Sequence, residues 1–170
     1  TINHVTPGKY QESKFEKIHS VVFESASIAS KVVAKEIADS IKEKKNKPFV
    51  LGLATGSSPI GVYKELVRIH KKEGLSFKNV ITFNLDEYVG IDKNHDQSYQ
   101  FFMNKHLFNN INFRRHYFPT EENYNEYDLM IKNSGGIDIQ ILGIGTNGHI
   151  AFNEPGSHKY SSTRIVDLTE

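Results

Sequence analysis

The chain has 170 residues, a length that suits one domain of ordinary size with a buried core. Its 21 lysines and arginines nearly balance 20 aspartates and glutamates, which argues against nucleic acid or an anionic membrane as a partner. Because the sequence has no cysteine and no long apolar run, it excludes disulfides, thiolate metal sites and a transmembrane helix.

The ends of the chain differ from its middle. Residues 1–14 are polar and contain a Pro-Gly pair, so we expect an N-terminal extension before a domain over residues 15–170. The first residues lack the basic and then apolar order of a secretory signal, which favours a cytoplasmic protein. The chain starts without methionine and stops just after a strand-like run at residues 163–166, so we expect the domain to be truncated at its C-terminus.

Strand-like and helix-like patterns alternate along the chain. Ser25 is a candidate cap for a helix that runs to about residue 45, and Pro59 opens a second helix with Val62, Leu66 and Ile69 on one face. Further helices are predicted at 98–109 and 120–133, and strands at 15–23, 48–54, 79–85 and 137–142. This alternation predicts an α/β fold in which helices cover a mostly parallel sheet, with the strand ends gathered at one edge.

The first polar segment at a strand end is Thr55-Gly56-Ser57-Ser58. The helix that follows presents unpaired backbone N–H groups, which bind phosphate readily, while the hydroxyls add donors and Gly56 permits close approach. The Walker pattern is absent, which favours a simple phosphate ester over a nucleoside triphosphate. The alternative is an ordinary helix start in which Ser58 is only the cap.

The second segment is Asp86-Glu87-Tyr88, where another apolar strand stops. Asp86 follows the strand most directly, so we expect it to be held rigidly at the sheet edge. A carboxylate there can act as a general base if burial raises its pKa. An ordinary acidic turn is the alternative.

The third segment follows the strand predicted at 137–142. Gly143, Gly145 and Gly148 match Gly-x-Gly-x-x-Gly, and Asp167 lies at a distance suited to a ribose, so a dinucleotide site is one interpretation. A proline soon interrupts any helix after the glycines, which argues against it. His149 and Glu154 instead suggest proton transfer. Their spacing does not match a helical metal-ligand pair, and no His-Glu-x-x-His motif occurs, so no metal is expected.

Together the three segments closely resemble the glucosamine-6-phosphate deaminase family. The matching stretches are LGLATGSSP at 51–59, TFNLDEY at 82–88 and GIGTNGHIAFNEP at 143–155, and the resemblance runs from about residue 17 to the end. It implies a three-layer, modified Rossmann-like fold with helices on both faces of the sheet. It also implies conversion of glucosamine 6-phosphate and water to fructose 6-phosphate and ammonia, without a metal or redox cofactor.

The resemblance also implies roles for single residues. The stretch 55–58 would hold the substrate phosphate, and Asp86 would move a proton between C2 and C1 of the sugar. His149 would open the pyranose ring, with Glu154 orienting and charging it. The small-molecule partner would therefore be a sugar phosphate. Basic residues that complete the phosphate pocket in the family would lie beyond residue 170.

Two features depart from the family pattern. Asn147 stands where many members have an aspartate; the amide can orient His149 but stabilises its charged form less, so we expect a different pH profile. Ser157 and Arg164 match positions where some bacterial members bind N-acetylglucosamine 6-phosphate as an activator at a subunit interface. Val166 replaces a lysine of those enzymes, which argues against activation here. Family members are often hexamers, so a homo-oligomer is expected.

Three other functions compete with the deaminase. A 6-phosphogluconolactonase shares the fold, but its segment after the histidine runs toward Ala-Ser-Leu-Phe-Pro, whereas this chain keeps Glu154 in Ile-Ala-Phe-Asn-Glu-Pro. A non-catalytic sugar-phosphate sensor would be expected to lack Asp86 or His149, and both are present. A nicotinamide-dependent dehydrogenase would bind NADH tightly. The sequence favours the deaminase.

Overall fold

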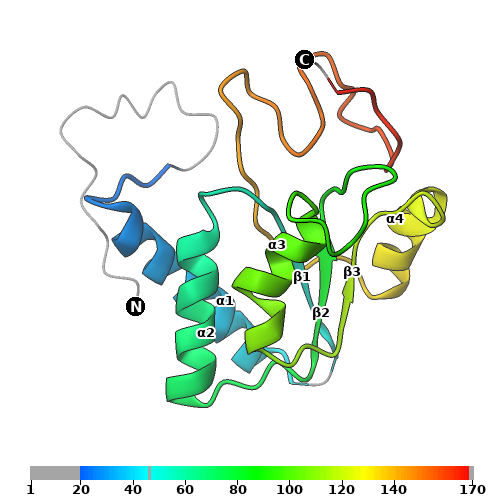
Figure 1. Cartoon of the computed structure of the whole chain (residues 1–170). Coiled ribbons are helices and arrows are strands. Elements are labelled where there is room, and N and C mark those ends of the chain that lie inside the picture. Colours follow the sequence, from blue (N-terminus) through cyan, green and yellow to red (C-terminus); the bar gives the residue numbers. More distant parts are fainter. Residues whose placement is uncertain (1–19, 46, 169–170) are drawn as a thin grey trace.

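The computed structural model describes residues 20–45 and 47–168 (Figure 1). The extension expected at residues 1–14 and the first part of the strand expected at 15–23 lie outside the described residues. Residues 20–23 form no strand, so that part of the prediction is wrong. Val21 and Val22 are exposed there, and apolar side chains without a buried face do not stabilise a strand.

Helices and strands alternate from residue 26 onward, as the sequence predicts. Their order is α1 (Ala26–Glu43), β1 (Phe49–Leu53), α2 (Ile60–Glu73), β2 (Val80–Asn84), α3 (Tyr99–His106), a short 3-10 helix η2 (Phe108–Asn110), β3 (Arg115–Tyr117), α4 (Tyr124–Asn133) and β4 (Ile139–Gln140). Helix α1 begins as expected, because the hydroxyl of Ser25 accepts a hydrogen bond from the backbone N–H of Ile28 at 3.3 Å.

The four strands form one parallel sheet in the order β3-β2-β1-β4. Strand β1 pairs with β2 along its whole length, from Phe49 opposite Val80 to Leu53 opposite Asn84. On its other side β1 pairs with β4 over two residues only. The strand order reverses between β1 and β4, and ligands bind in open α/β sheets at the carboxyl ends of strands that flank such a reversal.

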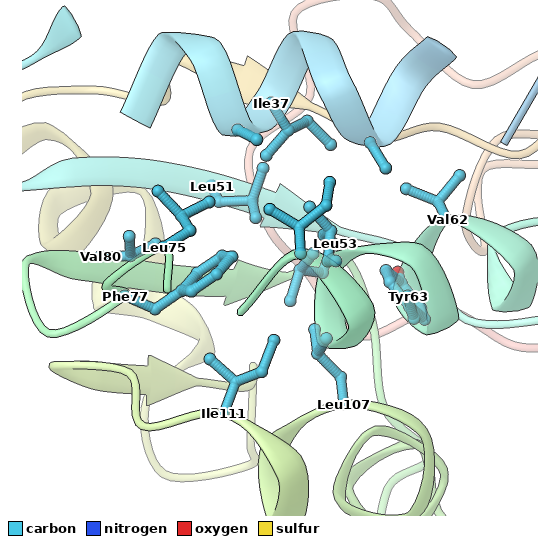
Figure 2. Close-up of a cluster of buried hydrophobic side chains, with 14 of the residues drawn as sticks. Ile37, Leu51, Leu53, Val62, Tyr63, Leu75, Phe77, Val80, Leu107 and Ile111 are labelled. Carbon is cyan, nitrogen blue, oxygen red and sulfur yellow. The ribbon is translucent and has the colours of Figure 1, made fainter. Parts of the chain in front are cut away.

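Helices cover both faces of the sheet, which confirms the predicted three-layer α/β architecture. The larger core lies on the face covered by α1, α2 and α3, where Ile37, Leu51 and Leu107 pack together (Figure 2). The smaller core lies on the opposite face, where Phe83 of β2 packs against Tyr127 of α4. Alternate residues of the strands serve the two cores, as the period of two in a strand requires.

Several helices and strands are shorter in the structure than the sequence predicts. The helix expected at 98–109 is divided into α3 and η2, the one expected at 120–133 begins only at Tyr124, and the last strand is reduced to Ile139–Gln140. Strand β3 was not predicted, because its two exposed residues give no apolar pattern. The strand-like run at 163–166 is not a strand: Thr163 instead donates hydrogen bonds from its N–H and hydroxyl to the Asp128 carboxylate.

Candidate active site

A cavity of about 560 Å³ opens at the carboxyl ends of β1, β2 and β4. In Figure 1 this is the edge of the sheet from which the orange segment extends. All three polar segments singled out in the sequence contribute to its wall, together with two aromatic residues. The lining residues are Ala54, Thr55, Gly56, Ser57, Ser58, Leu85, Asp86, Tyr99, Gly143, Ile144, Gly145, His149, Ala151, Phe152, Glu154 and Leu168.

The phosphate loop, residues 55–58, joins β1 to α2 and lines this cavity. Gly56 adopts a φ of 95°, a left-handed conformation that favours glycine. Helix α2 has Pro59 as its N-cap and no side-chain cap hydrogen bond, so Ser58 does not cap it. No acidic residue lies in its first turn. The N-terminus of α2 therefore keeps donors for an anion, and the interpretation of Ser58 as an ordinary cap is wrong.

A buried tyrosine fixes the start of the phosphate loop. The hydroxyl of Tyr63, on α2, accepts a hydrogen bond from the backbone N–H of Ala54 at 3.2 Å and donates one to the carbonyl of the same residue. Ala54 lies just after the last residue of β1, where the ladder to the neighbouring strand ends. Tyr63 thus satisfies the backbone at the point where the chain leaves the sheet and enters the loop.

A second tyrosine does the same for β2. The Tyr127 hydroxyl, on α4, lies 2.8 Å from the carbonyl oxygen of Asn84 and 3.1 Å from that of Tyr117. Asn84 is the last residue of β2, two positions before Asp86. Strands β1 and β2 are therefore each held at their carboxyl end by a tyrosine, and the two tyrosines come from helices on opposite faces of the sheet.

Asp86 lies at the cavity wall and has an unusual protonation equilibrium. Burial raises the pKa of its carboxyl to about 7, and the adjacent charge of Glu87 contributes in the same direction. A carboxyl group with a pKa near neutrality exists in both protonation states at physiological pH. It can therefore both accept and return a proton, which is the property required of a general base that moves a proton.

His149, Glu154 and Asn147 form one cluster on a tight turn. Glu154 Oε1 lies 3.4 Å from His149 Nδ1, an ion-pair distance without hydrogen-bond geometry, and this buried Nδ1 has no hydrogen-bond partner among the described residues. Asn147 bridges the other two: its amide nitrogen donates to Glu154 Oε2 at 2.6 Å, and its oxygen accepts from the His149 backbone N–H at 3.1 Å. The neutral amide thus orients the carboxylate toward the imidazole.

The imidazole of His149 lies directly against the backbone of Gly145. A Cβ atom at Gly145 would come within 2.3 Å of His149 Nε2, closer than any real contact. The backbone closes the same turn, with the Gly145 N–H donating to the His149 carbonyl at 2.9 Å. Gly148 has a φ of 90° within it. Gly145 is therefore needed for the position of the ring, which is a different role from pyrophosphate binding.

The dinucleotide interpretation of this segment is wrong. A dinucleotide fingerprint requires a helix to begin at the last glycine, whereas residues 149–168 contain turns and bends but no helix. Among the described residues no group of three or more histidine, aspartate or glutamate side chains is arranged to hold a metal ion. In the same part of the chain, no helix has the length and apolar character needed to cross a membrane.

Ser157 and Arg164 lie together but outside the cavity. Arg164 donates to the Ser157 hydroxyl at 3.3 Å and to the side-chain oxygen of Asn153 at 3.0 Å. Arg164 lines a larger neighbouring cavity of about 1060 Å³, which shares Asp86 and Phe152 with the first. The structure thus brings this pair together next to the segment that carries Glu154.

Comparison with known proteins places this chain in a family. The sequence profile of the family described as glucosamine-6-phosphate isomerases/6-phosphogluconolactonase matches residues 24–167. The chain belongs to this family. The match includes all ten residues that the sequence interpretation assigned to catalysis, phosphate binding or activation.

Individual members of this isomerase/lactonase family resemble the chain to different degrees. A glucosamine-6-phosphate deaminase of Clostridium perfringens is 50% identical over 149 residues, covering 83% of this chain and 61% of that protein. A solved monomeric glucosamine-6-phosphate deaminase is 42% identical with a TM-score of 0.81, covering 87% of this chain and 64% of that one. A 6-phosphogluconolactonase of Plasmodium vivax is 28% identical with a TM-score of 0.60, and the match covers 77% of this chain and 49% of that one. The chain spans about three fifths of the length of the curated relatives it matches.

Four aromatic residues in or behind the candidate site were not singled out by sequence reasoning. Tyr99 and Phe152 line the cavity, and their rings stack with centroids 5.8 Å apart. Tyr63 and Tyr127 lie behind the cavity wall. A signal for the last two was available, because a tyrosine in an otherwise apolar helix face needs a partner for its hydroxyl. The sequence could not show which backbone group that partner would be.

Proposed function

We propose that this chain carries the active site of a glucosamine-6-phosphate deaminase, which converts glucosamine 6-phosphate and water into fructose 6-phosphate and ammonia. One observation carries the proposal: a single cavity of about 560 Å³ is lined by the phosphate loop, by Asp86 and by the His149–Glu154 pair. The 50% identity to a protein with this activity in its name supports the same substrate.

Substrate binding begins at the phosphate. The loop at 55–58 offers three hydroxyls, and the N-terminus of α2 adds uncapped backbone donors. A helix N-terminus with no acidic residue nearby favours a dianionic phosphate. With the phosphate held there, the sugar extends toward Asp86 and His149, which line the same cavity.

Ring opening requires a proton at the ring oxygen and removal of one from the C1 hydroxyl. His149 is the group proposed for this transfer, since imidazole exchanges protons readily near neutral pH. Glu154 lies 3.4 Å from Nδ1 and stabilises the positive charge when the ring is protonated. Asn147 holds Glu154 in place through its 2.6 Å hydrogen bond.

Isomerisation and deamination follow on the open chain. Asp86 takes the proton from C2 while the C1 oxygen gains a proton, which gives an enol-amine. Asp86 then returns its proton to C1 and the nitrogen gives one up to solvent, which leaves an imine at C2. Water then adds to C2 and ammonia leaves, so that a ketone remains. A pKa of about 7 suits Asp86 to both halves of this transfer.

Oligomeric state and location stay predictions. A homo-oligomer is proposed from the family resemblance, although one similar protein of known structure is described as monomeric. Light scattering on the purified chain measures its mass directly. A cytoplasmic location is part of the same proposal, and fractionation of cells that express the protein tests it.

The test of the activity is ammonia release from glucosamine 6-phosphate, with fructose 6-phosphate measured in parallel. We expect equal amounts of both products, and we expect Asp86→Asn to reduce the rate by about 10²–10⁴-fold, the usual contribution of a general base. The matched control is Asp96→Asn, because the Asp96 side chain is 75% exposed and does not line the cavity. It should leave the rate unchanged.

Parallel assays distinguish the competing functions. Hydrolysis of 6-phosphogluconolactone without ammonia release would assign the chain to the lactonase side of the family. Binding of the amino sugar phosphate without turnover of either substrate would assign it to sugar-phosphate sensing. Either result would contradict the deaminase proposal.

A further inference from the structure

Two adjacent carboxylates after β2 lie in opposite surroundings. The Asp86 carboxylate has no hydrogen bond to it among the described residues. Glu87 accepts four: Oε1 accepts from the backbone N–H groups of Tyr88 at 3.0 Å and Tyr99 at 2.9 Å, while Oε2 accepts from the Ser98 hydroxyl and the Gln100 N–H, each at 2.9 Å. Neighbouring residues thus differ completely in hydrogen bonding.

Three of the four donors to Glu87 belong to the start of α3. Tyr99 and Gln100 are the first two residues of this eight-residue helix, and Ser98 is its N-cap. The third N–H of the helix, that of Phe101, donates to the Ser98 hydroxyl at 3.3 Å. Every N–H of the first three helical positions is therefore used, and Glu87 alone takes the two that a serine cap does not reach.

A helix N-terminus would otherwise favour the charged form of a nearby carboxyl group. Asp86 is next in the chain to Glu87, and Tyr99 at the start of α3 lines the same cavity as Asp86. If the donors of α3 were free, they would be available to Asp86. Glu87 occupies them, so Asp86 keeps an environment of burial without donors.

We propose that Glu87 is a positioning residue for Asp86: it ties the segment after β2 to the start of α3, so that Asp86 stays at the cavity wall, and it withholds the donors of this helix from the Asp86 carboxylate. The role of Asp86 as a base rests on the proposed function, whereas the positioning itself does not. Glu87 is absent from the lining of the smaller cavity, which holds the phosphate loop, although it lines the larger neighbouring cavity together with Asp86.

The negative charge of Glu87 and its use of the α3 donors both favour the protonated form of Asp86. Burial is the larger cause of the raised pKa of Asp86, and the neighbouring charge of Glu87 is the second. The other titratable groups around Asp86 include the phenols of Tyr99 and Tyr127, which interact with its charge, and the His149–Glu154 pair across the smaller cavity. Exposed charged groups, Glu121 and Arg164 among them, line the larger cavity that Asp86 shares. The phosphate loop contributes no ionisable side chain. Removing the Glu87 charge should therefore lower the pKa of Asp86.

The experiment is a pH titration of the Asp86 carboxyl carbon by NMR, with the full 170-residue chain labelled with ¹³C at aspartate. The signal is assigned by its loss in Asp86→Asn. In Glu87→Gln we expect the midpoint to fall by about one pH unit, a shift usual for the loss of a neighbouring like charge and the gain of donors. The reading needs no substrate, so it is independent of whether the chain releases ammonia.

Glu121→Gln is the matched control. Glu121 is exposed and lines the larger neighbouring cavity that Asp86 shares, but it has no bond to α3. The Glu121→Gln variant also removes one negative charge from the same side of the molecule. In this variant the titration midpoint of Asp86 should move by no more than about 0.3 pH units, because solvent screens exposed charges. An unchanged or raised midpoint in Glu87→Gln, or an equal shift in both variants, would overturn the proposal.

A measurement on the wild-type chain covers the case in which Glu87→Gln does not fold. Amide protons in the first turn of a helix normally exchange quickly, because they have no partner within the helix. Those of Tyr99 and Gln100 should instead be protected from exchange by at least about tenfold relative to Gly61 and Val62 of α2, for which no hydrogen bond to a cap side chain exists. Equal exchange in the two helices would contradict the role of Glu87.

Discussion

The two walls of the cavity are built differently. One wall consists of the phosphate loop and Asp86, which follow β1 and β2, and every residue of these two strands is buried. The other consists of residues 143–156, which follow β4, a strand of two half-buried residues. On this second wall the His149 side chain is 41% exposed and that of Glu154 33%. The core therefore fixes the first wall, and local hydrogen bonds fix the second.

The comparison assigns the steps of the proposed reaction to different parts of the molecule. Phosphate binding and proton transfer at C2 depend on groups carried by the buried sheet. Ring opening depends on a turn held by Asn147, by Gly145 and by its own backbone. An aromatic contact joins the walls: the Phe152 ring lies 5.3 Å from Tyr88 and 5.8 Å from Tyr99, centroid to centroid. Changes in the core should act mainly on the first wall, whereas changes in the turn should act mainly on the second.

The largest expected effect comes from truncating a core side chain beneath the first wall. Leu51, in the middle of β1, is completely buried in the larger core (Figure 2). Leu51→Ala should lower the free energy of unfolding by about 2–5 kcal/mol, because it removes buried apolar contacts and leaves a cavity. Urea denaturation measures the loss. The control, Leu129→Ala, truncates a residue that is 54% exposed and should change stability by less than about 0.5 kcal/mol.

The next effect concerns Asp86 and pH. Its pKa is about 7 in the folded chain against 3.8 for the free side chain, so the folded state holds a proton that the unfolded state releases between these values. This contribution to stability is fully present below pH 4 and is lost as the pH rises to 7. Asp86→Asn should not show this loss of stability with rising pH, because asparagine does not ionise. The variant should match the wild type near pH 3 and be more stable at pH 8, by at most about 4 kcal/mol, the equivalent of three pKa units.

Denaturation of both proteins across this pH range checks the prediction. Only the difference between them is used, because other groups titrate in the same range and cancel. A wild type that is the more stable of the two at pH 8 would show that Asp86 gains more from its surroundings than it loses by burial.

Tyr63→Phe should have a smaller effect on the first wall. The variant keeps the ring in the core but removes the hydroxyl that satisfies both the N–H and the carbonyl of Ala54. Buried groups left without a partner cost about 1–3 kcal/mol. We also expect a higher KM for the sugar phosphate with a smaller change in kcat, since the loop that binds phosphate loses its anchor. A changed kcat at constant KM would disagree with this role.

The smallest stability effect belongs to the second wall. Gly145→Ala places a methyl group where the His149 ring lies and should displace the ring, with a loss of stability below about 1 kcal/mol because the turn is exposed. Tyr160→Ala is the control, since the Tyr160 side chain is 77% exposed and does not line the cavity. Ammonia release should fall only in Gly145→Ala. Equal rates in the two variants would separate the position of His149 from catalysis.

The sequence predicted the fold well where the apolar pattern was strong. Strands β1 and β2 and helix α2 were recognised because buried positions repeat at regular spacing in each. Strand β3 was not predicted, because it has no apolar pattern. Its three residues form a strand through their pairing with β2. The run at 163–166 failed for the opposite reason: its pattern is strand-like, but its partner is the Asp128 side chain.

The candidate site shows the same limit. The phosphate loop, Asp86, His149 and Glu154 were predicted from residue type and position at strand ends, and all of them line one cavity. The hydrogen bonds of Glu87 and the contact between Gly145 and His149 were not predicted. Both depend on how segments approach in three dimensions, and neither residue type nor spacing specifies that approach.

The measurement that tests the central claim most directly is a crystal structure of the chain with the open-chain amino alditol 6-phosphate derived from glucosamine, which can neither close a ring nor isomerise. One ligand should contact both walls. Its phosphate should bind the loop at 55–58 and the N-terminus of α2, its C2 should lie within reach of the Asp86 carboxylate, and its C1 end should face His149. A phosphate bound in the larger neighbouring cavity, or a ligand that contacts one wall only, would contradict the account.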